Sequence, residues 1–196
     1  MRKLSTMALM MSFCVLVLAA LPACAQVDLI NEDFESVTVP ALPTGWTADD
    51  TNTDTYTWES HGSYACSGTQ DASVRWNAAM AMDDWLFTPV LALDSTHNYT
   101  LAFNYRAASA TYPEDLTVFI GTAASAGSQT TQLVDLPGIN NTDCAASSTA
   151  FTVGTTGTYY IGFHGHSAAD MFRLVVDDVV VTDESVPVEL QSFNIE

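Results

Sequence analysis

Alternating apolar and polar residues are the feature that most limits how this chain can fold. In residues 99–106 (YTLAFNYR) every second residue is apolar, and the same period of two recurs in residues 115–121 and 158–165. A period of two predicts half-buried β-strands. Residues 172–181 (FRLVVDDVVV) are so rich in β-branched residues that we expect a strand buried on both faces along part of its length.

Polar and turn-forming residues separate these segments. Clusters of Thr, Ser, Asn, Gly and Pro, as in residues 121–131 and 136–143, are expected to form loops. The sequence has no amphipathic helical stretch of useful length. Several short strands without helices predict an all-β fold, a jelly-roll β-sandwich of two antiparallel sheets.

The first 25 residues have the order of a secretory signal peptide. A basic start (MRK) precedes an apolar run over residues 7–21 and a small-residue triplet that ends at Ala25, where we expect cleavage. The run is short for a membrane span, so no transmembrane segment is predicted. The sequence LPAC also resembles a bacterial lipobox with Cys24 as the lipidated residue, but its proline is unusual there.

We therefore divide the chain into a signal peptide (1–25), one domain (26–184) and a tail (185–196). Cleavage would leave 196 − 25 = 171 residues, enough for one domain with a substantial core. The tail reads as the start of another strand or domain.

The mature chain is strongly acidic. The signal peptide holds two of the five basic residues and none of the 23 acids, which leaves 3 − 23 = −20 and three cations, Arg75, Arg106 and Arg173. Such a surface repels phosphate, so nucleic-acid binding is excluded. The general excess of acids favours solubility in a salty or calcium-rich medium, and only specific clusters argue for metal ligands.

Two cysteines remain after cleavage, Cys66 and Cys144. In an exported protein, two cysteines most simply form one disulfide. Neither has a Cys or His nearby at ligand spacing, which disfavours a metal site.

Several motifs together resemble a known family. The segments DFES, LPTGW, SHGS, DDWLFTP, YTLAFNYRA, LTVFIG and VVDDVVV occur in this order. They resemble the cleaved adhesin domains, including the choice-of-anchor J group, of bacterial surface and secreted proteins. The resemblance implies a MAM-like or carbohydrate-binding-module-like jelly roll with structural calcium and no catalytic activity. It also implies adhesion to proteins, haem or glycans, and reads the tail as a linker to a missing C-terminal sorting or Ig-like region.

Four acids are the candidate metal ligands. In NEDFES, Phe34 is expected to face the core, which places Asp33 and Glu35 on the opposite face. Asp177 and Asp178 should point to opposite sides of their strand, so that only one joins a given cluster. The resemblance favours Glu35 and Asp177 as ligands of a structural Ca²⁺ between the first and last strands, with Asp33 and Asp178 as substitutes.

A physical argument also favours a cation at Asp177. An unpaired carboxylate buried in so apolar a strand is costly, and hard oxygen ligands suit Ca²⁺. The alternative is that Asp177 pairs with Arg173 or Arg75, or lies at a solvated strand end.

Two further patterns could hold metals. Asp50, Asn52 and Asp54 match the first ligands of an EF-hand loop, but Thr55 replaces the required Gly and His61 stands in place of the bidentate Glu, which excludes an EF-hand. An Asx-rich turn is the simpler interpretation.

His164 and His166 share a strand face and could bind zinc or copper with a third ligand such as Asp170 or His61. Exposed turn histidines are commoner than such sites.

The aromatic residues give two expectations. Trp85 and Trp46 are predicted to be core residues, whereas Trp58, Trp76 and Tyr112 are less constrained and would suit stacking on a sugar ring if exposed.

Catalysis has little support in the sequence. Nucleophile-elbow and zinc-protease motifs are absent, as is any lysine after the signal peptide. Glu114 and Asp115 are adjacent and should diverge as turn acids, whereas retaining glycosidases need converging carboxyls about 5 Å apart.

We therefore predict a non-catalytic adhesion or ligand-binding module, secreted or on the bacterial cell surface, with an extracellular glycan or protein ligand. The alternatives are an accessory domain of a secreted hydrolase and a structural matrix subunit.

Overall fold

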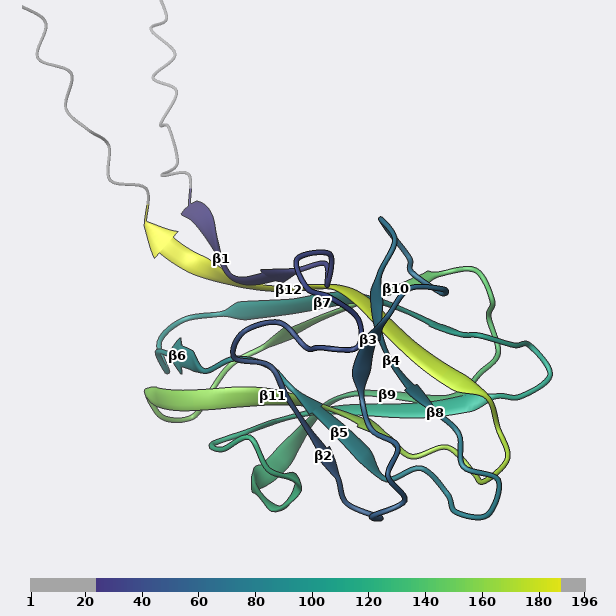
Figure 1. Cartoon of the computed structure of the whole chain (residues 1–196). Helices are drawn as coiled ribbons and strands as arrows, with labels where there is room; N and C mark the ends of the chain where they lie inside the picture. The colour runs from purple at the N-terminus through teal and green to yellow at the C-terminus, as the bar shows by residue number, and fades with distance from the viewer. Residues whose placement is uncertain (1–23, 188–196) are drawn as a thin grey trace, which may run out of the picture.

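A computed structural model describes residues 24–187 and shows two β-sheets packed face to face (Figure 1). The predicted signal peptide, apart from residues 24 and 25, lies outside the described residues, as do residues 188–196. In the described part of the chain, no helix is long and apolar enough to cross a membrane.

All strand pairs in both sheets are antiparallel. The first sheet runs in the order β10 (Ala145–Phe151), β7 (Tyr99–Ala107), β12 (Arg173–Pro187), β4 (Asp71–Arg75) and β3 (Glu59–His61), and β1 (Cys24–Glu32) also pairs with β12. The second runs in the order β2 (Thr47–Asp50), β5 (Asp84–Phe87), β11 (Gly157–Gly165), β8 (Glu114–Gly121) and β9 (Gln129–Ile139), and β6 (Leu91–Leu93) also pairs with β11. The predicted all-β sandwich of two antiparallel sheets is confirmed.

The alternating segments form the strands that face the core. In β7, the side chains of Tyr99, Leu101 and Phe103 are buried between the sheets, as the period of two predicts. In β12, residues 174–177 are all fully buried, which confirms burial on both faces.

The boundaries of the loops differ from the prediction. A short 3-10 turn (η1, Ala126–Ser128) precedes β9, and β9 continues through much of the segment expected to be a loop. β9 lies at the edge of its sheet, and its pairing with β8 shifts register three times. An interrupted edge strand accommodates the polar residues, Pro137 and Gly138 (φ 67°), which a central strand would exclude.

The first and last described strands lie side by side (Figure 1). β1 pairs antiparallel with β12 from Cys24 opposite Pro187 to Glu32 opposite Val179. Residues 185–187, assigned from the sequence to the tail, continue β12.

The two tryptophans predicted to be core residues occupy different places. Trp46 packs edge-on against Phe34 within the core, with ring centroids 5.2 Å apart. Trp85 is also buried, but it alternates with the core residue Leu86 and so lies on the outer face of the second sheet. There it stacks on His164 at 4.2 Å.

Candidate functional site

A β-bulge interrupts β12 at the two acids that the sequence singles out. The pairing with β7 shifts register between Asp177 and Val180, and Asp178 has a φ of 49°. A bulge breaks the strict alternation of side chains. The backbone N–H of Ser67 therefore donates to Asp177 Oδ2 (3.1 Å) while its hydroxyl donates to Asp178 Oδ1 (2.6 Å). The expectation that these two carboxylates serve opposite sides is wrong, because the bulge turns both toward one residue.

Backbone amides satisfy Asp177. It is fully buried, and the N–H groups of Cys66 (2.7 Å) and Asp178 (2.8 Å) also donate to its carboxylate. Burial raises the pKa of Asp177 to about 6, against the lowering effect of these hydrogen bonds. In the described part of the chain, neither Arg173 nor Arg75 forms an ion pair with it.

Glu35 holds the other end of the same segment. Its carboxylate accepts the N–H groups of Thr69 and Gln70 (both 2.6 Å) and the Thr69 hydroxyl (2.8 Å). These bonds lower the pKa of Glu35. Asp33 is exposed and accepts the N–H of Glu35 (3.1 Å). Glu35 and Asp177 are therefore joined through the backbone of residues 66–70.

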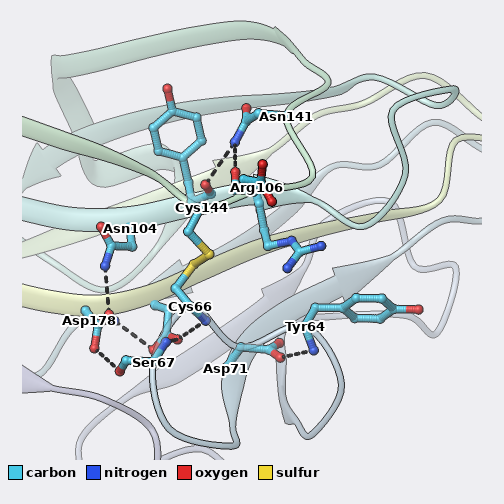
Figure 2. The surroundings of a disulfide bond; sticks show 12 residues. Tyr64, Cys66, Ser67, Asp71, Asn104, Arg106, Asn141, Cys144 and Asp178 are labelled. Carbon is cyan, nitrogen blue, oxygen red and sulfur yellow. Dashed lines mark hydrogen bonds between the residues drawn. A yellow bond between two sulfur atoms is a disulfide. The ribbon is translucent and has the colours of Figure 1, made fainter.

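The predicted disulfide fastens this segment across the first sheet. Cys66 and Cys144 are bonded, with their Cα atoms 5.6 Å apart, and Figure 2 shows the bridge crossing β12. Asp71, fully buried, accepts the N–H of Tyr64 (3.1 Å). We call residues 62–70 the strap. It lies over the outer face of the sheet, where Val175 is fully buried.

The strap contacts do not assemble a metal centre as they stand. Among the residues that the structure describes, no group of three or more His, Cys, Asp or Glu side chains is placed to hold one ion. N–H and O–H donors already occupy the carboxylates of Glu35, Asp177 and Asp178. The first and last strands are tied by their own pairing.

A second acidic group surrounds Asp84. In the Asx-rich turn, Asp50 accepts the N–H groups of Asp54 (3.1 Å) and Thr55 (2.9 Å). Asp50 lies directly opposite Asp84 in the pairing of β2 with β5. Asp84 is 1% exposed, and its Oδ1 has no hydrogen-bond partner. Burial, with the charges of Asp54 and Asp50, raises the pKa of Asp84 to about 7.

A cavity of about 210 Å³ opens beside the strap. Strands β3, β4 and β12 and the loops beside them contribute its lining, which consists of aromatic rings, guanidinium groups and a hydroxyl: His61, Ser63, Tyr64, Arg75, Trp76, Phe172 and Arg173. The rings of His61 and Tyr64 are stacked, with centroids 5.6 Å apart, and Phe172 meets Tyr64 edge-on at 6.3 Å. We call this cavity the strap pocket.

Buried acids fix the walls of the strap pocket. Asp71 holds Tyr64, as described above. Glu114, also fully buried, accepts the N–H of Phe172 (2.8 Å), whose own carbonyl accepts the N–H of Trp76 (2.9 Å). Burial raises the pKa of Glu114. These hydrogen bonds hold the backbone from which the lining side chains extend.

Three arginines lie at or beside this pocket. Arg173 lies opposite Arg75 in the pairing of β12 with β4. Arg106 extends over the Tyr64 ring, 6.0 Å from its centroid, and Figure 2 shows both side chains on the same side of the disulfide. Sequence reasoning missed this cluster, although the presence of only three cations beside 23 acids after residue 25 was a usable signal.

The histidine pair lies elsewhere, on the outer face of the second sheet. The rings of His164 and His166 are 5.1 Å apart, as their spacing predicts. His164 Nε2 contacts Asp83 (2.7 Å) and His166 Nε2 contacts Thr117 (2.9 Å). Burial lowers the pKa of His164. Hydrogen bonds thus occupy a nitrogen of each ring, and neither His61 nor Asp170 joins them in a metal-binding group within the described residues.

The remaining candidates have structural places. Trp58 is buried and donates from its ring nitrogen to the carbonyl of Asp84 (3.1 Å), whereas Tyr112 is 43% exposed. Glu114 and Asp115 begin β8 rather than forming a turn. As expected, they diverge: Glu114 binds the N–H of Phe172 and Asp115 that of Gly138 (2.7 Å).

The solved structures most useful for comparison share the fold at low sequence identity. The K3 cleaved adhesin domain of Lys-gingipain from Porphyromonas gingivalis W83 is 21% identical, with a TM-score of 0.67 over 81% of this chain and 99% of that one. The CBM22-1 xylan-binding domain of Paenibacillus barcinonensis Xyn10C is 14% identical, with a TM-score of 0.60 over 84% of this chain and 99% of that one. Among curated proteins, none has a matching sequence.

The family model describes nearly the whole folded region. The Cleaved Adhesin Domain model matches residues 29–181, which includes both ends of the strap's anchorage and all the residues of the strap pocket. This match confirms the resemblance drawn from the motifs. The chain belongs to the cleaved adhesin domain family.

Proposed function

We propose that this protein is a non-catalytic extracellular adhesion module that binds a glycan or protein ligand. The observation that carries the proposal is the lining of the strap pocket. Aromatic faces and guanidinium groups bind ligands by stacking and by charge-assisted hydrogen bonds. Although Ser63 and His61 both line the pocket, no hydrogen bond joins them among the described residues, so a nucleophile and its base are not assembled.

Binding without turnover tests the proposal. The purified protein should bind a subset of immobilised glycans or extracellular matrix proteins, and each bound ligand should be recovered intact after prolonged incubation. Mass spectrometry of the recovered ligand provides the measurement. Retention of no ligand, or cleavage of a retained one, would overturn the proposal.

We further propose that Ca²⁺ stabilises the module. The carboxylate that best fits a calcium ion is that of Asp84, with Asp50 opposite it in the strand pairing, because Asp84 is buried with an unpartnered oxygen among like charges. A divalent cation would compensate that charge. Glu35 and Asp177 are the second candidate set. Their carboxylates already accept backbone N–H groups, so some of these hydrogen bonds would have to break before the ion could bind.

Thermal unfolding separates the two candidate sets. Ca²⁺ at a hundredfold excess over its Kd should stabilise the native protein by about 2.7 kcal/mol relative to EDTA. Asp84→Asn should abolish this gain, whereas Glu35→Gln should lower the melting temperature equally with and without Ca²⁺. If Glu35→Gln and Asp177→Asn abolished the gain instead, the ion would belong to the strap. Equal melts of the wild type in Ca²⁺ and EDTA would contradict a structural calcium.

A further inference from the structure

The three cations of the mature chain are concentrated at one place. After residue 25 the chain has a net charge of 3 − 23 = −20, so most of its surface repels anions. Even so, Arg75 and Arg173 line the strap pocket, and Arg106 lies over the ring of Tyr64 without lining the pocket. Scattered solubilising charges would not place two arginines, from β4 and β12, in one cavity.

Of these arginines, Arg75 is the one available to a ligand. Arg173 already donates to the Ser73 hydroxyl (2.8 Å) and lies 3.6 Å from the Glu59 carboxylate. Arg75 is exposed, and its Cζ lies over the Tyr56 ring, 4.4 Å from the centroid. In the described part of the chain it forms no ion pair. A guanidinium placed over a ring without an ion-pair partner has N–H donors to offer a carboxylate.

The other walls favour a ring over a flexible chain. The rings of His61, Tyr64 and Phe172 give the pocket apolar walls, and buried acids bind the backbone N–H groups of Tyr64 and Phe172. Such walls suit the C–H groups of a pyranose, whereas an Asp or Glu side chain offers only one or two methylene groups. A volume of about 210 Å³ lies below the roughly 300–1,000 Å³ of sites for drug-sized ligands. The pocket therefore admits a single ring.

We propose that the strap pocket binds one carboxylated sugar residue, a uronic acid of an acidic glycan, with its carboxylate on Arg75 and its ring against Tyr64 and Phe172. This inference rests on the proposed ligand-binding function and names its ligand class. The strap, fixed by the Cys66–Cys144 disulfide and by Asp71, keeps the aromatic wall in place before the ligand arrives.

Matched ligands isolate the contribution of the carboxylate. Oligogalacturonate and its methyl ester share the same rings and differ only at the carboxyl group, which is charged in the acid and a neutral methyl ester in the other. Charge-assisted hydrogen bonds are about twice as strong as neutral ones, so calorimetric titration of the wild type should give roughly tenfold tighter binding of the free acid. Arg75→Gln should remove that preference. It alters an exposed side chain, so its melting temperature should match the wild type.

Arg106→Gln is the matched control variant. It changes the net charge by the same amount, but its side chain does not line the pocket, so the preference should fall less than threefold. Equal losses in the two variants would indicate a general field effect and overturn the assignment.

The remaining outcomes separate this inference from the proposed function. Equal affinity of the wild type for the acid and the ester, unaffected by Arg75→Gln, would leave a glycan-binding module and overturn the uronate pocket. Tighter Arg75-dependent binding of an oligoglutamate peptide would reassign the pocket to acidic protein ligands. Binding of no glycan and no matrix protein would overturn the proposed function itself.

Discussion

Replacement of Asp84 by asparagine is expected to stabilise the calcium-free protein at pH 7 and to flatten its dependence on pH. Asp84 is 1% exposed with an unpartnered Oδ1, and burial beside Asp54 and Asp50 raises its pKa to about 7. In the unfolded chain an aspartate titrates near pH 4. The group therefore contributes most to stability below pH 4, and that contribution is lost as the pH rises to 7. About three pKa units correspond to roughly 4 kcal/mol.

The measurement is denaturant unfolding at several values between pH 4 and pH 7 in EDTA. The difference between wild type and Asp84→Asn should grow with pH, because asparagine carries no charge to desolvate. Asp177, whose pKa is raised to about 6, leaves a smaller slope of the same sign in both proteins. Asp143→Asn removes the same charge at an exposed position and should not reproduce the stabilisation. A difference that stays constant with pH would contradict the titration of Asp84 in this window.

The double variant Cys66→Ala/Cys144→Ala is expected to lose about 4.5 kcal/mol of stability. The disulfide closes a loop across a sequence separation of 78 residues, and the chain-entropy model assigns such a crosslink about 4.5 kcal/mol through the unfolded state. That is a large part of the 5–15 kcal/mol typical of a folded domain. The strap should nevertheless keep its place in the native state, because Asp177, Asp71 and Glu35 still bind its amides.

Equilibrium unfolding of the double variant and of the reduced wild type provides two independent measurements that should agree. Ser67→Ala, in the adjacent position, removes the hydroxyl bond to Asp178 without removing the crosslink, and should cost only about 1 kcal/mol. A loss below 1 kcal/mol in the double variant would show that the unfolded chain is not restrained by the crosslink.

The alternating pattern predicted the strands well because a single physical rule governs it. A strand with one buried face must repeat every two residues, and the first part of β7 follows that rule, whereas β8 and β11 also bury consecutive residues. The rule says which residues share a face, but not whether that face is covered by the opposite sheet or by something else. Trp85 shows the difference, since it is buried on the outer face by stacking on His164.

The acids were harder to place because their partners are backbone groups. From the sequence we weighed a metal ion, an arginine and a solvated strand end for Asp177, and the structure adds amide donors from a distant loop. No side-chain pattern encodes the position of an N–H group. The bulge that turns Asp178 toward Ser67 is likewise invisible to alternation. The arginine cluster depends on the register of β4, β7 and β12, which only the folded sheet determines.

The pairing of β1 with β12 also decides how the module responds to mechanical load. Its two described ends, Cys24 and Pro187, lie opposite each other at one end of an antiparallel pair. Tension applied there separates the strands one rung at a time instead of shearing many hydrogen bonds together, so the module yields at low force. The disulfide then prevents the 78-residue span between its two cysteines from extending, which is roughly 260 Å of extended chain. Under tension the domain would therefore begin to extend at low force, and the disulfide would limit how far it extends.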